Sequence, residues 1–544
     1  MRRNLPDMGS QTFDLAIIGG GITGACIARD AARRGLRVAL VEKRDFSCGT
    51  SSASSKLVHG GLRYLQTFEF GLVRESLRER RVWEQIAPHM VYPLQFLLPV
   101  YGRGARFFLN AGLTVYDLLS FDRNRLDDPD KHMPGHRRIS AAAALELEPR
   151  LKPEGLAGAM LYYDCQMYSP ERLGLECLID AAAHGASIAN YAEVIGFKRD
   201  GLTIAGIDVR DVLTGDTTAI KAKIVVNAAG PWADRLLSML ENGPPSHKLI
   251  RSKGIHVIVG PMTRGHALTV AHKGGHFFVL PWRGHTIIGT TDSVFDGNPD
   301  DVHVGDAEIA AFLSFVNEGL PGANLKTQDV IYAYAGLRPL VDDGKKDSYN
   351  ASRRAELVDH AAEGGVSNLI SAIGGKWTTS RDIAEKCVDL IEGKSGRKLK
   401  ACDTAEAPLP GGATGRFAAF VSGATKDQPG VEAEIIANLT RNYGARYKAV
   451  LALATTRRDL MERIAPRLPD IGAQLLFAIR DEMALTLDDA LFRRTGLGTL
   501  GRLDAAAIER AAKIMAAELG WNEAEIARQI ASIAPRYAPL AKAA

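Results

Sequence analysis

One segment of the chain, residues 51–64, gathers side chains suited to proton transfer on a small anionic molecule. It reads SSASSKLVHGGLRY, with four serines, a lysine, a histidine, an arginine and a tyrosine around two adjacent glycines. Hydroxyls and a guanidinium hold anionic oxygens, and a histidine exchanges a proton near neutral pH. Helix N-capping is the commoner role for any single serine. The segment predicts one wall of a substrate pocket, with Arg63 and Tyr64 as substrate contacts and His59 as a candidate base.

Two cations further along the chain add to this charge pattern. Arg338 lies in YAGLRPL after a β-rich run, and Lys376 follows a glycine pair in IGGKWTTSR. An arginine binds phosphate or carboxylate oxygens in pairs, and adjacent glycines let the backbone approach a ring or a phosphate. Surface solvation is the alternative for both cations, and a structural role is the alternative for both candidate bases, His59 and His256. We predict that Arg338 and Lys376 form the opposite wall and that these four residues are catalytic.

A dinucleotide-binding fingerprint precedes these groups. The β-rich run at 13–18 leads into glycines at 19, 21 and 24, and a helical stretch at 25–34 ends at a glycine. A second strand, at 37–41, ends in Glu42, near the separation of about 20 residues expected for a carboxylate that binds ribose. The glycines permit a tight turn beside a pyrophosphate, and the helix N-terminus offers unpaired N–H groups. This order of elements predicts a βαβ unit of the flavin-binding type.

A flavin cofactor sets three requirements on the residues around it. To oxidise an alcohol, the protein must hold a C–H bond against the ring, take up the hydroxyl proton and neutralise the charge of the substrate. The expected substrate contacts are Arg63, Tyr64, His256, Arg338 and Lys376. The expected cofactor contacts are Gly19, Gly20, Gly21, Ile22, Thr23, Gly24, Glu42, Lys43, Ser51, Ser52, Ser55, His59, Gly60, Gly61, Ala229, Gly230, Gly336, Arg338, Gly375, Lys376, Trp377 and Thr378.

The rest of the chain alternates between strand-like and helical stretches, which predicts an α/β fold. Strand-like runs at 187–197, 203–212 and 222–228 precede an alternating pattern at 256–259 and 276–292 that predicts an antiparallel sheet over the flavin ring. The arginine-rich stretch at 66–150 is predicted to be helical. We predict an oxidoreductase domain at 1–391, with FAD-binding parts at about 13–65, 150–230 and 330–391 and substrate or cap parts at about 66–149 and 231–329, then a linker at 392–415 and a helical domain at 416–544.

Composition is that of an average globular protein of several domains. The 544 residues are 46% hydrophobic and 24% charged, and the net charge of +4 gives no indication of nucleic-acid binding. Six scattered cysteines predict neither a metal site nor disulfides. We find no targeting segment and no apolar window of about 20 residues that would predict a membrane-spanning helix. The arginine-flanked apolar segment at 103–125 suits a lipid headgroup layer or a buried helix equally.

Several motifs resemble one known family. IIGGGITGACIARDAARRG, SSASSKLVHGGLRYL, NAAGPWAD, IIGTTD, AGLRPL and IGGKWTTSR are similar to the respiratory, quinone-linked FAD-dependent glycerol-3-phosphate dehydrogenases over residues 13–390, and NYGARY and DDALFRRTGLG extend the similarity beyond. The resemblance implies a Rossmann-like FAD-binding domain, interrupted by an antiparallel substrate domain as in D-amino-acid oxidase, and a C-terminal helical domain. It implies oxidation of sn-glycerol 3-phosphate with electrons passed to ubiquinone at the cytoplasmic face of the cell membrane, which residues 107–119 would enter.

The same resemblance places the predicted residues around the flavin. It implies that Arg63, Tyr64, His256, Arg338 and Lys376 line the substrate pocket and that His59 lies beside the flavin ring. The chain departs from the family at 165–170, where CQMYSP follows a YYD turn in place of a tryptophan or glutamine, a valine and two aspartates. Another polyol phosphate as substrate and an oxidase that uses oxygen therefore stay open. A tRNA-modifying or structural flavoprotein is a further alternative, and the oligomeric state is open, with a homodimer as one candidate.

Overall fold

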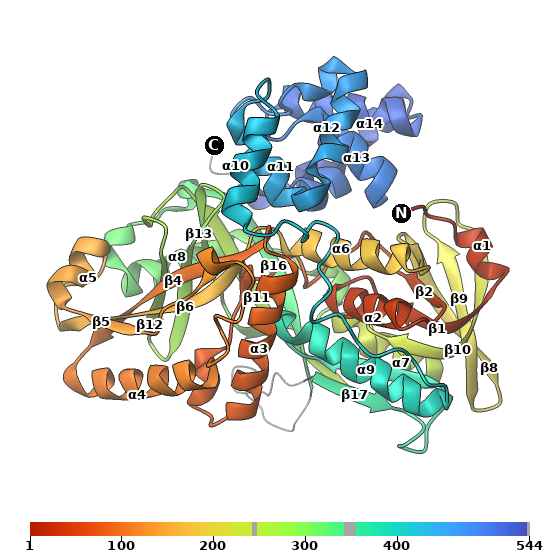
Figure 1. Ribbon diagram of the computed structural model, residues 1–544, viewed down its shortest axis with the longest axis horizontal. Helices are drawn as coiled ribbons and strands as arrows, with labels where there is room; N and C mark the ends of the chain where they lie inside the picture. The colour runs from red at the N-terminus through yellow and green to blue at the C-terminus, as the bar shows by residue number, and fades with distance from the viewer. Residues whose placement is uncertain (242–246, 342–354, 541–544) are drawn as a thin grey trace.

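The computed structural model describes residues 1–241, 247–341 and 355–540. Two β-sheets lie side by side, and a group of C-terminal helices covers the region above both of them (Figure 1). The predicted α/β fold with an antiparallel second sheet and a C-terminal helical part is confirmed.

The first sheet is mostly parallel and carries the fingerprint. Its strand order is β17(Ala355–Asp359)–β18(Leu369–Gly374)–β10(Thr217–Asn227)–β1(Thr12–Ile18)–β2(Val38–Val41)–β7(Ser187–Ala189), and β8(Ala192–Asp200) and β9(Thr203–Asp211) extend it from β10. The strands β18, β10, β1 and β2 run parallel to their neighbours in this order. Their carboxyl ends therefore meet at one edge, where open α/β sheets bind ligands.

Helices cover the first sheet because its parallel strands are apolar on both faces. The helices α2(Ile22–Arg33), α6(Pro170–Ala183) and α9(Ser380–Ser395) pack together there, with buried small side chains along α2. The prediction of a strand, helix and strand at 13–41 is confirmed, although the helix begins at Ile22, inside the glycine motif.

The second sheet is antiparallel apart from one pair of strands. Its order is β15(Ser293–Val294)–β11(Leu249–Val259)–β14(His285–Gly289)–β13(Gly275–Trp282)–β12(Ala267–His272)–β4(Val91–Tyr101)–β6(Leu156–Met167)–β3(Leu57–Val58), with β16(Val330–Val341) on β11 and β5(Arg137–Ile139) on β6. The antiparallel arrangement predicted at 256–259 and 276–292 is confirmed. The helix α8(Asp306–Gly319) packs against β12.

Two strands of this sheet differ from the sequence-based expectation. The stretch 66–150 is helical at α3(Phe70–Ile86), α4(Arg103–Leu119) and α5(Ala141–Leu147), but the prediction is wrong at 91–101, which forms β4. The strand β6 continues to Met167, so the expected turn at 165–170 is instead the end of a strand and the start of α6, capped by the Ser169 hydroxyl. Hydrophobic residues fill both faces of β4 and β6, so neither shows the alternation typical of a half-exposed strand.

The C-terminal part is helical, as predicted. It contains α10(Phe417–Asp427), α11(Ala433–Tyr443), α12(Tyr447–Thr456), α13(Gly472–Glu482), α14(Ala505–Leu519) and α15(Glu523–Ile533). One hydrophobic core includes side chains of these helices together with those of the second sheet and α4. The preceding segment, 396–416, has no helix or strand, yet Leu399 and Leu409 are buried against the first sheet's core. The exact domain limits stay predictions.

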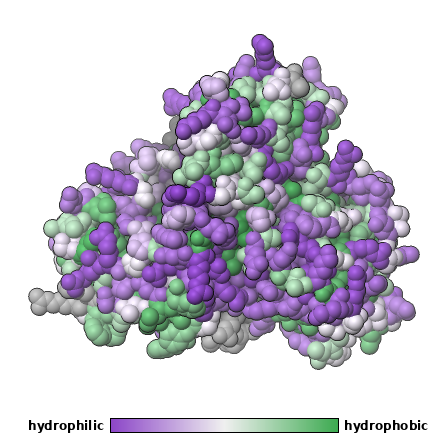
Figure 2. Space-filling view, in the orientation of Figure 1, coloured by the Kyte–Doolittle hydropathy of each residue, from purple (hydrophilic) through white to green (hydrophobic). Residues whose placement is uncertain are grey.

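The helix α4 is amphipathic and peripheral. Leu113 and Tyr116 face the interior, whereas Phe107, Phe108 and Leu118 are exposed. Hydrophobic surface gathers at the lower left of Figure 2, where Figure 1 places α4. Within the described ranges, no helix has the combined length and hydropathy that crossing a membrane requires.

Candidate active site

The glycine motif forms a cradle at the carboxyl end of β1. Gly19 has φ of +111°, and a Cβ there would lie 2.6 Å from the Ala228 carbonyl oxygen. A Cβ on Gly24 would lie 2.0 Å from the Gly19 carbonyl oxygen, so glycine is required at both positions. The Ile22 N–H at the start of α2 donates to the Ser51 hydroxyl at 2.9 Å. The turn is therefore compact, and the positive end of α2 faces the sheet edge.

Glu42 lies at the carboxyl end of β2, beside this cradle. Its carboxylate accepts from the Gly20 N–H at 2.8 Å and from the Arg44 N–H at 2.9 Å. These bonds fix the carboxylate beside the turn and leave it further acceptor capacity for ribose hydroxyls. Lys43, also an expected cofactor contact, forms an ion pair with Asp300 at 2.8 Å.

The serine-rich segment contacts the second sheet through His256. The Ser55 hydroxyl lies 2.8 Å from His256 Nε2, and the imidazole stacks on Tyr334 with ring centroids 4.9 Å apart. His256 Nδ1 is buried and has no hydrogen-bond partner within the described residues. Burial, followed by the charges of Arg338 and Lys56, lowers the pKa of His256 well below its ordinary value. His256 is therefore a neutral imidazole at physiological pH.

Arg338 lies on β16 next to this histidine. Its guanidinium donates to the Ser252 hydroxyl at 3.0 Å and the Thr290 hydroxyl at 2.9 Å, and Asp292 lies 3.8 Å away. The side chain keeps 25% of its surface exposed. Two hydroxyls thus orient the guanidinium, with the Asp292 carboxylate as a more distant ion-pair partner, and its exposed part suits contact with an anionic substrate.

The second half of the segment, residues 59–64, contacts the turn after β18. The His59 N–H donates to the Thr378 hydroxyl at 3.2 Å. Lys376 Nζ lies 4.3 Å from the centre of the Tyr64 ring, and a Cβ on Gly61 would come within 3.2 Å of the same ammonium. The Arg63 guanidinium carbon lies 5.4 Å from the centre of the same ring. His59, Tyr64 and Lys376 therefore lie together.

The predicted residues thus form two groups that the segment 51–64 joins. Ser55, His256 and Arg338 make one group, and the residues around Lys376 make the other. Lys376 contacts Tyr64 at the end of the segment, and the arrangement of Arg338 and Lys376 as the opposite wall of a pocket stays a prediction. The short β18–α9 turn brings Lys376 to Tyr64, which spacing along the sequence does not reveal.

Comparisons with known proteins agree with this geometry. The family model described as "FAD dependent oxidoreductase" matches residues 14–381, and "C-terminal domain of alpha-glycerophosphate oxidase" matches residues 402–526. A glycerol-3-phosphate dehydrogenase from Synechocystis is 39% identical, with 97% of each chain covered. The chain belongs to the FAD-dependent glycerol-3-phosphate dehydrogenase family. An aerobic glycerol-3-phosphate dehydrogenase from Staphylococcus haemolyticus is 32% identical over 91% of this chain and 88% of its own length.

Solved structures support the same family. The glycerol-3-phosphate dehydrogenase from Bacillus halodurans, solved with FAD, is 30% identical with a TM-score of 0.79, covering 98% of this chain and 96% of its own. Glycine oxidase from Geobacillus kaustophilus shares the fold, with a TM-score of 0.54 over 73% of this chain and 98% of its own, at 24% identity. FAD is therefore the cofactor of this protein.

The residues at the edge of the first sheet fit FAD. The glycine cradle would hold the pyrophosphate, and Glu42 the ribose, because both lie where the carboxyl ends of β1 and β2 meet. Ala229 and Gly230 follow β10, and Gly375, Trp377 and Thr378 follow β18, at the same edge. A Cβ on Gly336 would lie 2.6 Å from the Ala53 carbonyl oxygen, so this glycine admits the serine-rich segment. The individual cofactor contacts stay predictions.

A buried group under the 59–64 turn was not predicted from the sequence. The Gly60 N–H donates to the Tyr116 hydroxyl at 3.0 Å and to Asp164 at 3.2 Å, and Arg80 pairs with the same carboxylate at 2.7 Å. Tyr334 was not predicted either, although Tyr334, Gly336 and Arg338 alternate along one strand and therefore share a face. That spacing was available in the sequence, whereas the packing of Asp164 was not.

One cluster outside the site resembles a metal site by residue type, where the sequence predicted no metal. Donor atoms of His247, His360 and Glu363 lie within 4.8 Å of one another. His247 Nε2 already pairs with Glu363 at 2.7 Å, and His360 Nε2 bonds the Ser371 hydroxyl at 2.9 Å. These bonds account for the cluster as a structural contact between β18 and its neighbours.

Proposed function

We propose that this protein oxidises sn-glycerol 3-phosphate to dihydroxyacetone phosphate, with FAD as first electron acceptor and a quinone as the second. The observation that carries the proposal is the position of Arg338, which two hydroxyls orient beside the neutral His256. A guanidinium next to a proton acceptor suits an alcohol that bears a phosphate. The name of the relative from Synechocystis supports the same substrate.

The reaction removes a hydride from C2 of the substrate and a proton from its hydroxyl. Bound FAD supplies the hydride acceptor. Arg338 binds phosphate oxygens, and Lys376 with Arg63 supplies further positive charge from the other group. His256 accepts the hydroxyl proton at Nδ1, and His59 is the alternative base. His256 suits this role because it is neutral before the reaction.

The substrate and the acceptor are tested in turn on the purified holoenzyme. Glycerol 3-phosphate added without oxygen is expected to bleach the flavin absorbance, and a soluble ubiquinone analogue is expected to restore it faster than oxygen does. Bleaching by a different polyol phosphate alone would replace the substrate, and faster recovery with oxygen would make the protein an oxidase. If neither glycerol 3-phosphate nor other polyol phosphates bleach the flavin, the proposed function is wrong.

We further propose that α4 brings the enzyme to the cytoplasmic face of the membrane, where quinone is found. Its Phe107 and Phe108 side chains are 74% and 76% exposed, and Leu118, about three turns further along the helix, is 68% exposed. An apolar face of this kind suits the headgroup layer of a bilayer. Phe107→Ser with Phe108→Ser is expected to abolish co-sedimentation with phosphatidylglycerol vesicles, whereas Leu202→Ser, on a remote exposed turn, is expected to leave it intact. Equal co-sedimentation of both variants would exclude α4 as the anchor.

A further inference from the structure

The segment that follows β2, residues 42–51, wraps around the glycine cradle. Glu42 accepts from the Gly20 N–H, and the Ser47 N–H donates to the Gly20 carbonyl at 3.0 Å. Ser51 accepts from the Ile22 N–H at the opposite end of the segment. Three bonds therefore connect this cradle segment, as we name residues 42–51, to the backbone expected to hold the pyrophosphate. The position of the segment determines the shape of the cradle.

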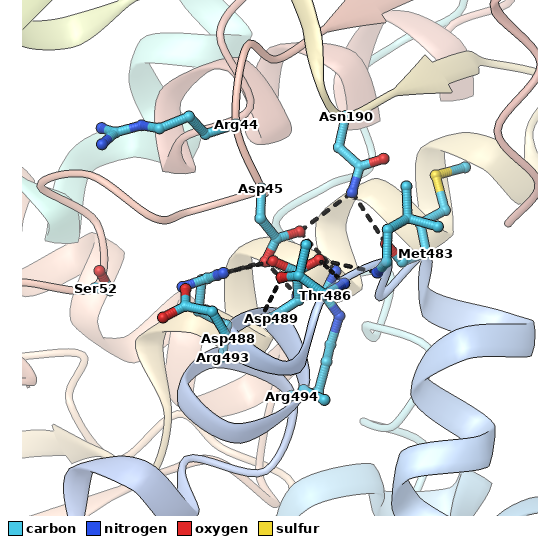
Figure 3. Close-up of polar contacts among 12 residues, drawn as sticks. Arg44, Asp45, Ser52, Asn190, Met483, Thr486, Asp488, Asp489, Arg493 and Arg494 are labelled. Atoms are coloured by element: carbon cyan, nitrogen blue, oxygen red, sulfur yellow. Dashed lines mark hydrogen bonds and ion pairs between the residues drawn. The ribbon is translucent and has the colours of Figure 1, made fainter. Parts of the chain in front are cut away.

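The C-terminal domain binds this cradle segment through the side chain of Asp45. The Asp45 side chain is fully buried, and Figure 3 shows it pointing toward the C-terminal helices while Arg44 points away. Arg494 binds it with two nitrogens, each at 2.8 Å from a different carboxylate oxygen, and Arg493 binds it through Nε. Asn190 donates to it at 3.3 Å and also bonds the Met483 carbonyl at 3.0 Å.

The cluster contains three carboxylates and two buried arginines, and a third arginine, Arg536, pairs with one of the carboxylates, Asp488, at 2.6 Å. Arg493 also pairs with Asp489 at 2.6 Å and Asp488 at 2.7 Å, and the side chains of Arg493 and Arg494 are at most 6% exposed. Burial alone would raise the pKa of Asp45, but Arg494 and Arg493 outweigh it and hold the pKa below its ordinary value. A buried carboxylate bound on both oxygens has little freedom to move. The cradle segment is therefore fixed by residues almost 450 positions away in the sequence.

We infer that Arg493 and Arg494 are positioning residues of the FAD site, acting through Asp45 on the cradle segment. This role rests on FAD as the cofactor and not on the identity of the substrate. It assigns the C-terminal domain a part in building the cofactor site: the domain holds the segment whose three bonds shape the cradle. Loss of the bonds from Arg493 and Arg494 to Asp45 lets the segment move relative to Gly20 and Ile22 and weakens FAD binding.

The test measures FAD affinity in the full-length protein without substrate. Asp45→Asn keeps the shape of the side chain and removes its charge, and Arg494→Lys keeps the charge and removes the paired bonds. Both variants, stripped of cofactor and titrated with FAD by fluorescence quenching, are expected to bind FAD at least about tenfold more weakly, which corresponds to ~1.4 kcal/mol. Hydrogen exchange of the amides at 43–51 is expected to accelerate in both.

The matched control is Glu482→Gln. Glu482 forms a buried pair with Arg172 at 2.8 Å in the same domain interface. Its backbone carbonyl accepts from Arg494, but the substitution changes only its side chain, which has no bond to the cradle segment within the described residues. This variant is expected to lower thermal stability as much as Asp45→Asn does. Its dissociation constant for FAD is expected to stay within about twofold of the parent value, well below the tenfold change expected of the two test variants. Equal FAD affinities in all three variants would overturn the inference. Failure of both test variants to fold, beside a folded Glu482→Gln, would also overturn it, because the cluster would then serve folding in general.

Discussion

The proposed role of Arg338 in binding the substrate can be tested separately from the binding of the cofactor. Its guanidinium is oriented by Ser252 on β11 and by Thr290, which directly follows β14. Each charged hydrogen bond contributes about 1.5–3 kcal/mol, so Arg338→Ala is expected to raise KM for glycerol 3-phosphate by about tenfold to a hundredfold. The measurement is steady-state kinetics together with FAD content from the absorbance spectrum.

The neighbouring cation Lys253 supplies the control for Arg338. It follows Ser252 on β11, so its side chain faces the other side of the sheet, where it pairs with Glu308 at 2.7 Å. Lys253→Ala is expected to leave KM unchanged. Loss of FAD from Arg338→Ala, or an equal rise in KM for both variants, would contradict the proposed role of Arg338.

His256 gives a pH dependence whose sign is fixed by its surroundings. Burial, Arg338 and Lys56 hold the pKa of this imidazole well below 6.5 in the folded protein. The unfolded chain therefore binds a proton near pH 6.5 that the folded chain does not, and the free energy of unfolding falls as the pH drops below that value. We expect His256→Asn to lose less stability than the parent between pH 7 and pH 5, measured by urea unfolding.

The same pKa shift sets an expectation for catalysis. Because burial, Arg338 and Lys56 hold the pKa of His256 well below 6.5, the rate of flavin reduction should show no inflection from this residue near pH 6.5. For the urea unfolding of His256→Asn described above, the control is His132→Asn, a substitution at an exposed position. An inflection near pH 6.5 that disappears only in His256→Asn would show that the imidazole titrates normally and would contradict its buried, neutral state.

At the scale of elements, α4 connects the exposed apolar face to the 59–64 turn. Tyr116 lies on the inner face of the helix. Its hydroxyl accepts from the Gly60 N–H at 3.0 Å and donates to the Asp164 carboxylate at 2.8 Å. Tyr116→Phe removes both bonds and is expected to cost about 1–3 kcal/mol of stability. Because the turn carries His59 and Tyr64, we also expect a lower kcat with FAD retained, measured by stopped-flow flavin reduction.

A second tyrosine hydroxyl provides a control that separates the lower kcat expected of Tyr116→Phe from general destabilisation. Tyr92 lies on β4, and its hydroxyl bonds Gln166 at 2.8 Å, on the neighbouring strand β6. Tyr92→Phe is expected to lose similar stability without slowing flavin reduction. Equal rates in the two variants would show that Tyr116 stabilises the fold without positioning the turn.

The elements also show which parts of the fold the sequence can predict. The first βαβ unit was predictable because its glycines, helix and strand follow each other within 30 residues, and local geometry alone requires that order. The strands β4 and β6 were not, because each is buried on both faces and finds its partner about 65 residues away. The candidate site residues of the 51–64 segment were recognisable by type, but the contact between Lys376 and Tyr64 depends on how the chain turns after β18.

The whole molecule is held together by contacts that no local pattern encodes. Asp45, Arg172 and Arg29 each bind groups that lie hundreds of residues away, and each is buried. The sequence motif DDALFRRTGLG identified the family without indicating that its arginines reach the cradle segment. A buried charge requires a partner but does not specify which one, so such pairings emerge only from the assembled fold.

The segment at 396–416 shows how firmly the two parts of the chain are joined. Arg29 on α2 donates to the carbonyls of Thr404 at 3.0 Å and Ala407 at 2.6 Å, and it pairs with Asp180 at 2.6 Å.

Arg29→Met keeps most of the side-chain volume but leaves these buried acceptors without their donor, at a cost of about 3–5 kcal/mol. We expect trypsin to cleave after Lys398 or Lys400 at least ten times faster, measured by mass spectrometry of the native protein, because cleavage tracks local opening. Asp403→Ala, which removes the exposed partner of Arg33 within the segment and leaves the pair between Arg33 and Asp180 in place, should change the rate little, since surface ion pairs contribute about 0–1 kcal/mol. Equal cleavage of both variants would show that the segment is held by its buried leucines and not by Arg29.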